Sequence, residues 1–245
     1  MLRLSAVSLC LLLSACGGLP PAAEAPASAP VAVRPAAEFR LSRAQFEQLF
    51  PKRLPFYTYE GLVAAATAYP QFANGGDAER DRQEMAAFLA NIMQESDSLQ
   101  AVREYNQAAY DHYCRQGPGE SCAPGQQYYG RGPIQLSWNF NYLHAGQALG
   151  LDLWGNPDLV ATDATVAWKT ALWYWMERTG PATMTAHEAM QGGIGFGGTI
   201  RAINGIVECD QPGDATAQRR IARRLAFYTQ AAQVLEVSRG GNLGC

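Results

Sequence analysis

Apolar side chains recur at helical spacing along much of the chain, whereas the alternation typical of strands is rare. The clearest stripe is Met85, Phe88, Leu89 and Ile92, which follow one another at the i, i+3, i+4, i+7 positions of one helix face. Asp77 precedes this stripe where a helix-capping residue is expected. The pattern predicts a helix that begins after Asp77 and buries one face.

Two more helices are predicted on the N-terminal side of this one. Ser42 and Gln45 have the spacing of a capping box ahead of an apolar run, and Pro51 is expected to end that helix. The segment "EGLVAAATAYP" predicts a second helix that runs to Pro70.

The C-terminal half predicts two long helices. Asp163 is placed to cap "ATVAWKTALWYWMERT", which Gly180 and Pro181 are expected to close. The final helix carries its apolar residues on one face: Ile221, Leu225, Tyr228, Ala232 and Leu235. The segments between helices hold most of the Gly, Asn and Tyr, and such loops commonly form binding clefts. We therefore predict a mainly α fold with one small β-hairpin and long cleft-forming loops.

The first residues have the pattern of an export signal. "MLRLSAVSLCLLLSACGG" has a basic Arg3, then an apolar run too short to span a membrane, and it ends in Leu-Ser-Ala-Cys. Ordinary signal peptides also end in small residues, but the cysteine at this place resembles a bacterial lipobox. We predict that residues 1–15 are a lipoprotein signal peptide and that Cys16 is lipidated. Gly17, not Asp, follows Cys16, which favours the outer membrane of a Gram-negative bacterium.

Residues 16–40 are dominated by Pro and Ala, a composition that cannot bury a core. We predict a tether that reaches roughly 60–70 Å from the lipid. Residues 41–245 then form one catalytic or binding domain, large enough for a well-buried core.

The charge balance excludes a nucleic-acid partner. The chain has 19 basic and 22 acidic residues, and removing Arg3 with the signal leaves 18 and 22. The one cluster of arginines, at positions 219, 220, 223 and 224, lies on a predicted helix, where a solvated face is the usual explanation.

Four cysteines remain in the exported chain: Cys114, Cys122, Cys209 and Cys245. In an exported protein they imply two disulfides with three possible connectivities, and their spacing disfavours the alternative of a zinc site. Cys114 and Cys122 close a short polar loop, which favours their pairing with each other.

Two glutamates are candidates for acid and base chemistry. Glu95 follows Ile92 by three residues, so it lies on the buried stripe at the C-terminal end of the predicted helix. Burial and the partial negative charge of a helix C-terminus both disfavour the ionised carboxylate there. Glu104 follows after the turn-forming "SDS" and is expected to face Glu95 across a groove. The alternative for Glu104 is an ion pair with Arg103 or another surface arginine.

The stretch "YYGRGPIQLSWNFNY", residues 128–142, combines aromatic rings with side-chain amides. Flat rings beside amide donors and acceptors suit a sugar with N-acetyl groups. The alternative is a buried turn whose hydroxyls and amides bond to backbone.

This stretch closely resembles the signature of glycoside hydrolase family 19, the lysozyme-like helical chitinases. Five more segments resemble the same family in the same order: "FYTYEGLVAAATAYPQFANGGD", "AAFLANIMQES", "WKTALWYWM", "GFGGTIRAINGIVEC" and "GGNLGC". The resemblance extends from Leu41 to Cys245 and implies a bilobal, lysozyme-like helical fold.

The resemblance implies a role for each matched position. Glu95 matches the general acid and Glu104 the general base of an endo-acting, inverting enzyme that cleaves β-1,4-linked N-acetylglucosamine polymers. The matched residues that bind the sugar, position water or line the cleft are Gln135, Ser137, Asn141, Lys169 and Asn204. Arg224 and Glu208 match an ion network that supports the acid, so one member of the arginine cluster is expected to point inward. The disulfides implied are Cys114–Cys122 and Cys209–Cys245.

The chain departs from the family pattern at Gln94, Ser96, Phe140 and Trp168, which leaves the substrate open. The same machinery could cleave peptidoglycan, or the protein could be a sugar-binding lipoprotein without catalysis. We expect no metal or cofactor, a polysaccharide partner, membrane attachment through Cys16, and a monomer.

Overall fold

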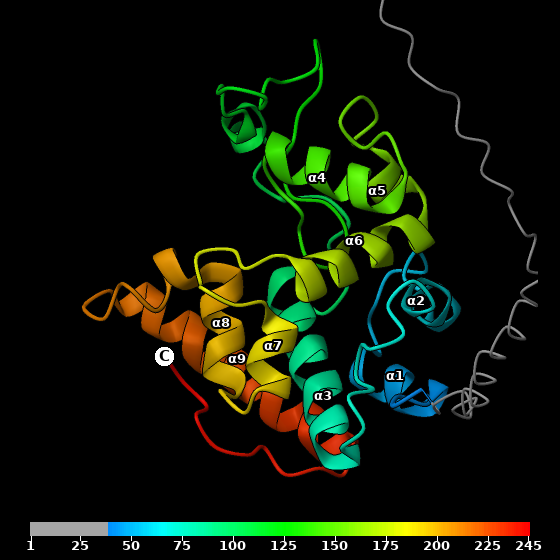
Figure 1. Ribbon diagram of the computed structural model, residues 1–245, viewed down its shortest axis with the longest axis vertical. Helices are drawn as coiled ribbons and strands as arrows, with labels where there is room; N and C mark the ends of the chain where they lie inside the picture. The colour runs from blue at the N-terminus through cyan, green and yellow to red at the C-terminus, as the bar shows by residue number, and fades with distance from the viewer. Residues whose placement is uncertain (1–38) are drawn as a thin grey trace, which may run out of the picture. The chain divides into compact units, whose positions relative to one another are not determined.

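The computed structural model describes residues 39–245 (Figure 1). The predicted signal peptide, the predicted lipidation site at Cys16 and nearly all of the predicted tether lie outside the described residues. The described helices are α1 (Arg43–Leu49), α2 (Tyr59–Ala66), α3 (Ala78–Glu95), η1 (Gln107–Tyr113), α4 (Asn139–Leu149), α5 (Leu159–Thr162), α6 (Ala164–Glu177), α7 (Ala186–Gln191), α8 (Phe196–Asn204), η2 (Gly205–Val207) and α9 (Ala215–Val234).

The helix caps expected from the sequence form as predicted. Ser42 and Gln45 make a reciprocal capping box at α1. The carboxylates of Asp77 and Asp163 accept the first free backbone N–H groups of α3 and α6. The four apolar residues of the α3 stripe are all fully buried. Caps and stripes depend on a few neighbouring residues, and for that reason they can be read from the sequence.

The predicted end of α2 at Pro70 is wrong. The helix ends at Ala66, and the backbone N–H groups of Ala68 and Tyr69 bond three residues back in turns. A residue before proline is disfavoured in helical conformation, so the chain leaves the helix before it reaches Tyr69.

The predicted β-hairpin is also not formed: residues 39–245 contain no strand. Its place is taken by two isolated bridges, in which Arg131 pairs with Arg103 and with Leu136. No helix among these residues is both long and apolar enough to cross a membrane.

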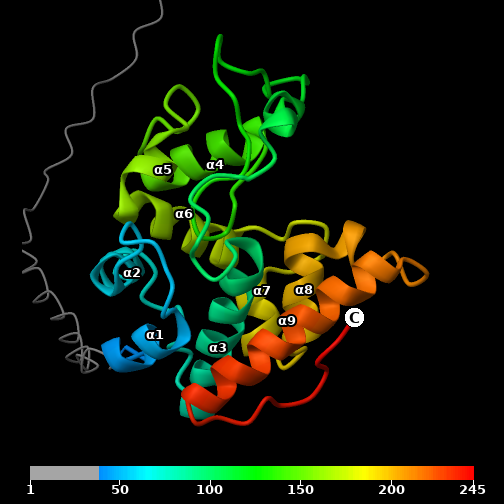
Figure 2. The same ribbon diagram turned by 180° about the vertical axis from the view of Figure 1, so that it is seen from behind.

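The helices form two groups on either side of α6 (Figure 1). α3 and α9 pack along each other with α7 and α8 beside them, and both views show α4 and α5 on the far side of α6 (Figure 2). Trp168 and Trp175 of α6 contact Phe88 of α3 in the common core. This arrangement is the mainly helical, bilobal fold that the sequence implied.

A buried glutamate joins three of these helices. Glu84 of α3 is fully buried, and its carboxylate accepts hydrogen bonds from Trp175 Nε1 of α6 at 2.8 Å and Gln191 Nε2 of α7 at 2.6 Å. His187 Nδ1 of α7 lies 2.7 Å from the same carboxylate. A buried carboxylate with several donors holds its neighbours in one arrangement.

The contact with Glu84 predicts a pH-dependent stability. Burial alone lowers the pKa of His187, but the hydrogen bond and negative charge of Glu84 outweigh burial and raise it above 6.5. The folded state therefore binds the proton more tightly than the unfolded state, and this stabilisation is complete below pH 6.5. It is lost as pH rises from there through the raised pKa.

Urea denaturation of the wild type and of His187→Gln at several pH values from about 5.5 to 8.5 measures this contribution. The free energy of unfolding should fall with rising pH more steeply in the wild type than in the variant. His112→Gln, at an exposed histidine, is the control. Equal slopes in the wild type and His187→Gln would contradict the prediction.

Candidate active site

Glu95 is the last residue of α3, and a tight turn follows it. Ser96 Oγ donates to the carbonyl of Ile92 at 2.7 Å and accepts from the N–H of Leu99 at 3.0 Å. Positions 97–99 all have positive φ, between 52° and 64°, so the chain reverses within three residues. The returning chain is fixed by the N–H of Glu104, which donates to the carbonyl of Gly130 at 2.8 Å.

Glu104 is held by hydrogen bonds and not by an ion pair. The Tyr113 hydroxyl donates to Glu104 Oε1 at 3.0 Å, and the backbone N–H of Gly130 lies 3.5 Å from Oε2. Burial, together with this carboxylate, raises the pKa of Tyr113 to about 12, so the phenol stays a donor at neutral pH. Arg103 pairs with Asp158 at 3.0 Å, so the surface-pair alternative for Glu104 finds no support.

Glu95 belongs to a buried charge cluster. Arg224 is fully buried and donates to Glu95, to both oxygens of Glu208 at 2.8 Å, and to Asn91 Oδ1 at 2.9 Å. The two carboxylates outweigh burial and raise the pKa of Arg224 above its ordinary value. The other arginines of the cluster, at 219, 220 and 223, are exposed, so one member points inward as expected.

This cluster has consequences for protonation. With both carboxylates ionised, two negative charges share one guanidinium. A proton on Glu95 leaves Arg224 and Glu208 as a neutral pair in the interior, where an unbalanced charge is costly. Glu208 is fully buried, whereas the Glu95 side chain is 16% exposed. Glu95 is therefore the member of the cluster that can exchange a proton with a ligand.

Both glutamates line one cleft of about 510 Å³. Four of the polar residues expected to bind sugar line it too: Gln135, Ser137, Asn141 and Asn204. Lys169 does not line it. On α6, Lys169 is five residues before Tyr174, which does line the cleft, and this places the two about 140° apart around the helix.

The 128–142 stretch is neither wholly a loop nor only a buried turn, because its last four residues begin α4. Asn141 Nδ2 donates to the carbonyl of Ser137 at 2.9 Å. Asn141 Oδ1 is buried without a hydrogen-bond partner among the described residues, so its acceptor capacity is unused. A Cβ on Gly130 would lie 2.8 Å from Gln135 Oε1, so the glycine permits this approach.

Several cleft residues were not expected from the sequence, notably Tyr113, Tyr174, Ile203 and Val207. Tyr174 lies within a quoted family segment, but Tyr113 ends η1, in a polar segment with no periodicity to mark it. Its place depends on the contacts of that loop.

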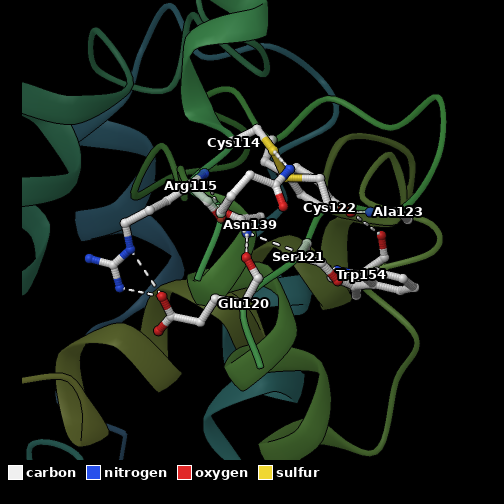
Figure 3. Close-up of a disulfide and its surroundings, with 10 residues drawn as sticks. Cys114, Arg115, Glu120, Ser121, Cys122, Ala123, Asn139 and Trp154 are labelled. Carbon is white, nitrogen blue, oxygen red and sulfur yellow. Dashed lines mark hydrogen bonds and ion pairs between the residues drawn. A yellow bond between two sulfur atoms is a disulfide. The ribbon is translucent and has the colours of Figure 1, made fainter. Parts of the chain in front are cut away.

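The loop after Tyr113 is anchored to the start of α4 (Figure 3). Cys114 is bonded to Cys122 across it. Asn139 accepts from the N–H of Arg115 at 2.9 Å, and its amide donates to the carbonyl of Arg115 and to a second loop carbonyl, each at 2.8 Å. The anchored loop holds the phenol of Tyr113 against Glu104. The second disulfide joins Cys209 to Cys245, so both pairs are those that the family resemblance implied.

The departures from the family pattern lie in different surroundings. Trp168 is fully buried in the core, and Ser96 shapes the turn after Glu95. Gln94 Oε1 is buried and has no partner among the described residues. Phe140 lies under the guanidinium of Arg115 at 4.4 Å, beyond the two glutamates in the cleft.

Comparison with known proteins agrees with this geometry. Residues 41–245 match the family profile described as Chitinase class I of glycoside hydrolase family 19. The crystal structure of chitinase C from Streptomyces griseus HUT6037 is 50% identical, with a TM-score of 0.80 over 85% of this chain and 81% of that chain.

Two plant relatives are similar over most of the described residues. Chitinase 3 of Oryza sativa subsp. japonica is 42% identical over 214 residues, which is 78% of this chain and 66% of the relative. Inactive chitinase-like protein 1 of Hevea brasiliensis is 38% identical over 237 residues, which is 84% of this chain and 74% of the relative. The chain thus spans roughly two thirds to three quarters of the length of these plant relatives. From the family match and these identities, we conclude that the chain belongs to glycoside hydrolase family 19.

Proposed function

We propose that the protein is an endo-acting, inverting chitinase that cleaves β-1,4 bonds between N-acetylglucosamine units. The observation that carries this proposal is the pair of carboxylates in one cleft with different surroundings. Glu95 adjoins a neutral Arg224–Glu208 pair, and Glu104 is held by a phenol and a backbone N–H. Environments that differ in this way separate an acid from a base.

In the proposed reaction, Glu95 gives its proton to the glycosidic oxygen as the C–O bond breaks. Glu104 takes a proton from a water molecule, whose oxygen bonds to the anomeric carbon from the opposite face. Asn141 and Ser137 line the cleft with the two glutamates, and we assign them the orientation of the water or of the N-acetyl group. After product release, Glu104 passes its proton to solvent and Glu95 regains one.

A sugar-binding protein without catalysis is the second candidate, since one relative carries the word inactive in its name. The geometry favours catalysis. Both glutamates line the cleft, and neither is neutralised by an exposed arginine: Arg103 pairs with Asp158, and Arg223 with Asp97.

The stereochemistry of the first product tests the proposal. Proton NMR during hydrolysis of a chitin hexamer should show the α-anomer before mutarotation, because water enters opposite the leaving group. An initial β-anomer would show a retaining mechanism and contradict the role given to Glu104. A folded protein that binds the hexamer without cleaving it would favour the second candidate.

We further propose that the protein is exported and anchored in the outer membrane of a Gram-negative bacterium through Cys16, and that it acts as a monomer. The lipobox-like sequence and the Pro/Ala-rich residues 16–40 support the anchor. A cleft formed within one chain supports the monomer.

Expression in a Gram-negative host with labelled fatty acid tests the anchor. Label should enter the wild type, and Cys16→Ser should remove the label and leave the protein unprocessed or mislocalised. An unlabelled wild type would refute the anchor.

A further inference from the structure

The cleft continues past the two glutamates into a second arm of about 540 Å³. Trp138, Asn141 and Tyr174 line both arms, so a chain of sugars bound at the glutamates can extend into it. The second arm differs in charge from the first, whose charged residues are the two glutamates. Its basic and acidic residues are Arg115, Arg178, His144 and Glu120, and we call it the basic arm.

Arg115 does not give the basic arm a free charge. Glu120 accepts from Arg115 Nε at 3.0 Å and pairs with its Nη2, so the two side chains neutralise each other. The guanidinium carbon of Arg115 lies over Phe140, 4.4 Å from the centre of the ring. No other acidic residue lines this arm, so Arg178 is left without a counter-charge there.

Arg178 has an unsatisfied donor. It is half-buried at the end of α6, and its Nε is buried with no hydrogen-bond partner among residues 39–245. The adjacent acid, Glu177, accepts instead from the hydroxyl of Tyr69 at 2.8 Å. Burial raises the pKa of Tyr174, and the positive charge of Arg178 partly offsets that effect. Arg178 follows Tyr174 by one helical turn, and Tyr174 lines both arms, so Arg178 lies close to their junction.

A neutral glycan would cover this charge without pairing it. Chitin carries no ionised group, so binding it across Arg178 would remove water from a guanidinium and supply no carboxylate in return. A carboxylate on the glycan could instead pair with the guanidinium of Arg178, which has no counter-charge in this arm, in a charge-assisted bond.

Building on the proposed function, we infer that the basic arm binds a carboxylate carried by an amino-sugar chain, with Arg178 as its principal ligand. Glycan strands of peptidoglycan have this chemistry, because every second sugar carries a lactyl ether whose carboxylate is free once the stem peptide is removed. The same arm disfavours de-N-acetylated, cationic units. The protein would then accept neutral chitin at the glutamates and prefer an acidic strand along the whole cleft.

Competition measures this preference in the full-length protein. In the assay, the protein hydrolyses a neutral chitin hexamer in the presence of one of two competitors. The first is a short, peptide-free peptidoglycan strand, and the second is the same strand with its lactyl carboxylates converted to methyl esters. The acidic strand should inhibit about 3- to 10-fold more strongly than its ester, as expected for a partly buried charge pair. The difference should shrink as salt is raised to about 1 M, because screening weakens the pair.

Arg178→Gln should abolish the preference for the acidic strand and leave kcat on the neutral hexamer unchanged. Arg220→Gln, which removes an exposed arginine of α9, should keep the preference and controls for net charge. Equal inhibition by acid and ester in the wild type, or an unchanged ratio in Arg178→Gln, would overturn the inference. A wild type that does not cleave the hexamer would instead refute the proposed function, and calorimetric titration of acid and ester strands would then decide this inference separately.

Discussion

Glu95→Gln is expected to lower kcat on chitin oligomers by about 10²-fold or more. The amide keeps the shape of the side chain and a contact to Arg224 but has no proton to give to the leaving oxygen. Glu104→Gln should cause a similar loss, because the amide cannot accept a proton from the attacking water. Sugar binding should change little in either variant, since Asn141 and Ser137 remain in place.

Steady-state kinetics and calorimetric binding of the hexamer separate these effects. Glu60→Gln, at an exposed glutamate of α2, is the matched control and should keep wild-type turnover. The wild type should show a bell-shaped pH–rate profile, from an acid and a base with separate roles. Near wild-type turnover by Glu104→Gln would return Glu104 to a structural role and leave the proposed mechanism without its base.

The sequence predicts those parts of this site that depend on local chemistry. Two local signals predict α3: the helical spacing of its apolar residues and its N-cap residue Asp77. Together they give its buried stripe and the place of Glu95 at its end. The return of the chain toward Glu104 follows from the turn residues after Glu95. The general resemblance to a family then supplied Arg224 as the inward arginine, which its charge alone would have assigned to a solvated face.

Other parts depend on contacts between distant segments and could not be predicted in this way. α8 contains two adjacent glycines, which are poor helix formers. The structure shows why one is needed, since a Cβ on Gly197 would lie 2.0 Å from the carbonyl of Gly244 in the C-terminal segment. The separation of Lys169 from the cleft likewise depends on which face of α6 meets it.

Arg224→Met is expected to cost about 3–5 kcal/mol of the free energy of unfolding. Glu208 is fully buried, and without the guanidinium its charge has no counter-ion; its remaining bond is from Asn204 Nδ2 at 3.2 Å.

Urea denaturation of Arg224→Met, Glu208→Gln and the double variant Arg224→Met/Glu208→Met measures the coupling. Removing both partners should cost less than removing Arg224 alone, because no buried charge is left unpaired. Glu208→Gln should remain folded but lose turnover, since Arg224 would then pair with Glu95 alone and hold it as the carboxylate. Its pH–rate profile should lose activity on the basic side first. Wild-type stability in Arg224→Met would contradict the argument from the buried charge of Glu208. Wild-type turnover by Glu208→Gln at neutral pH would show that the cluster does not set the protonation of Glu95, and the acid role would then rest on Glu95 alone.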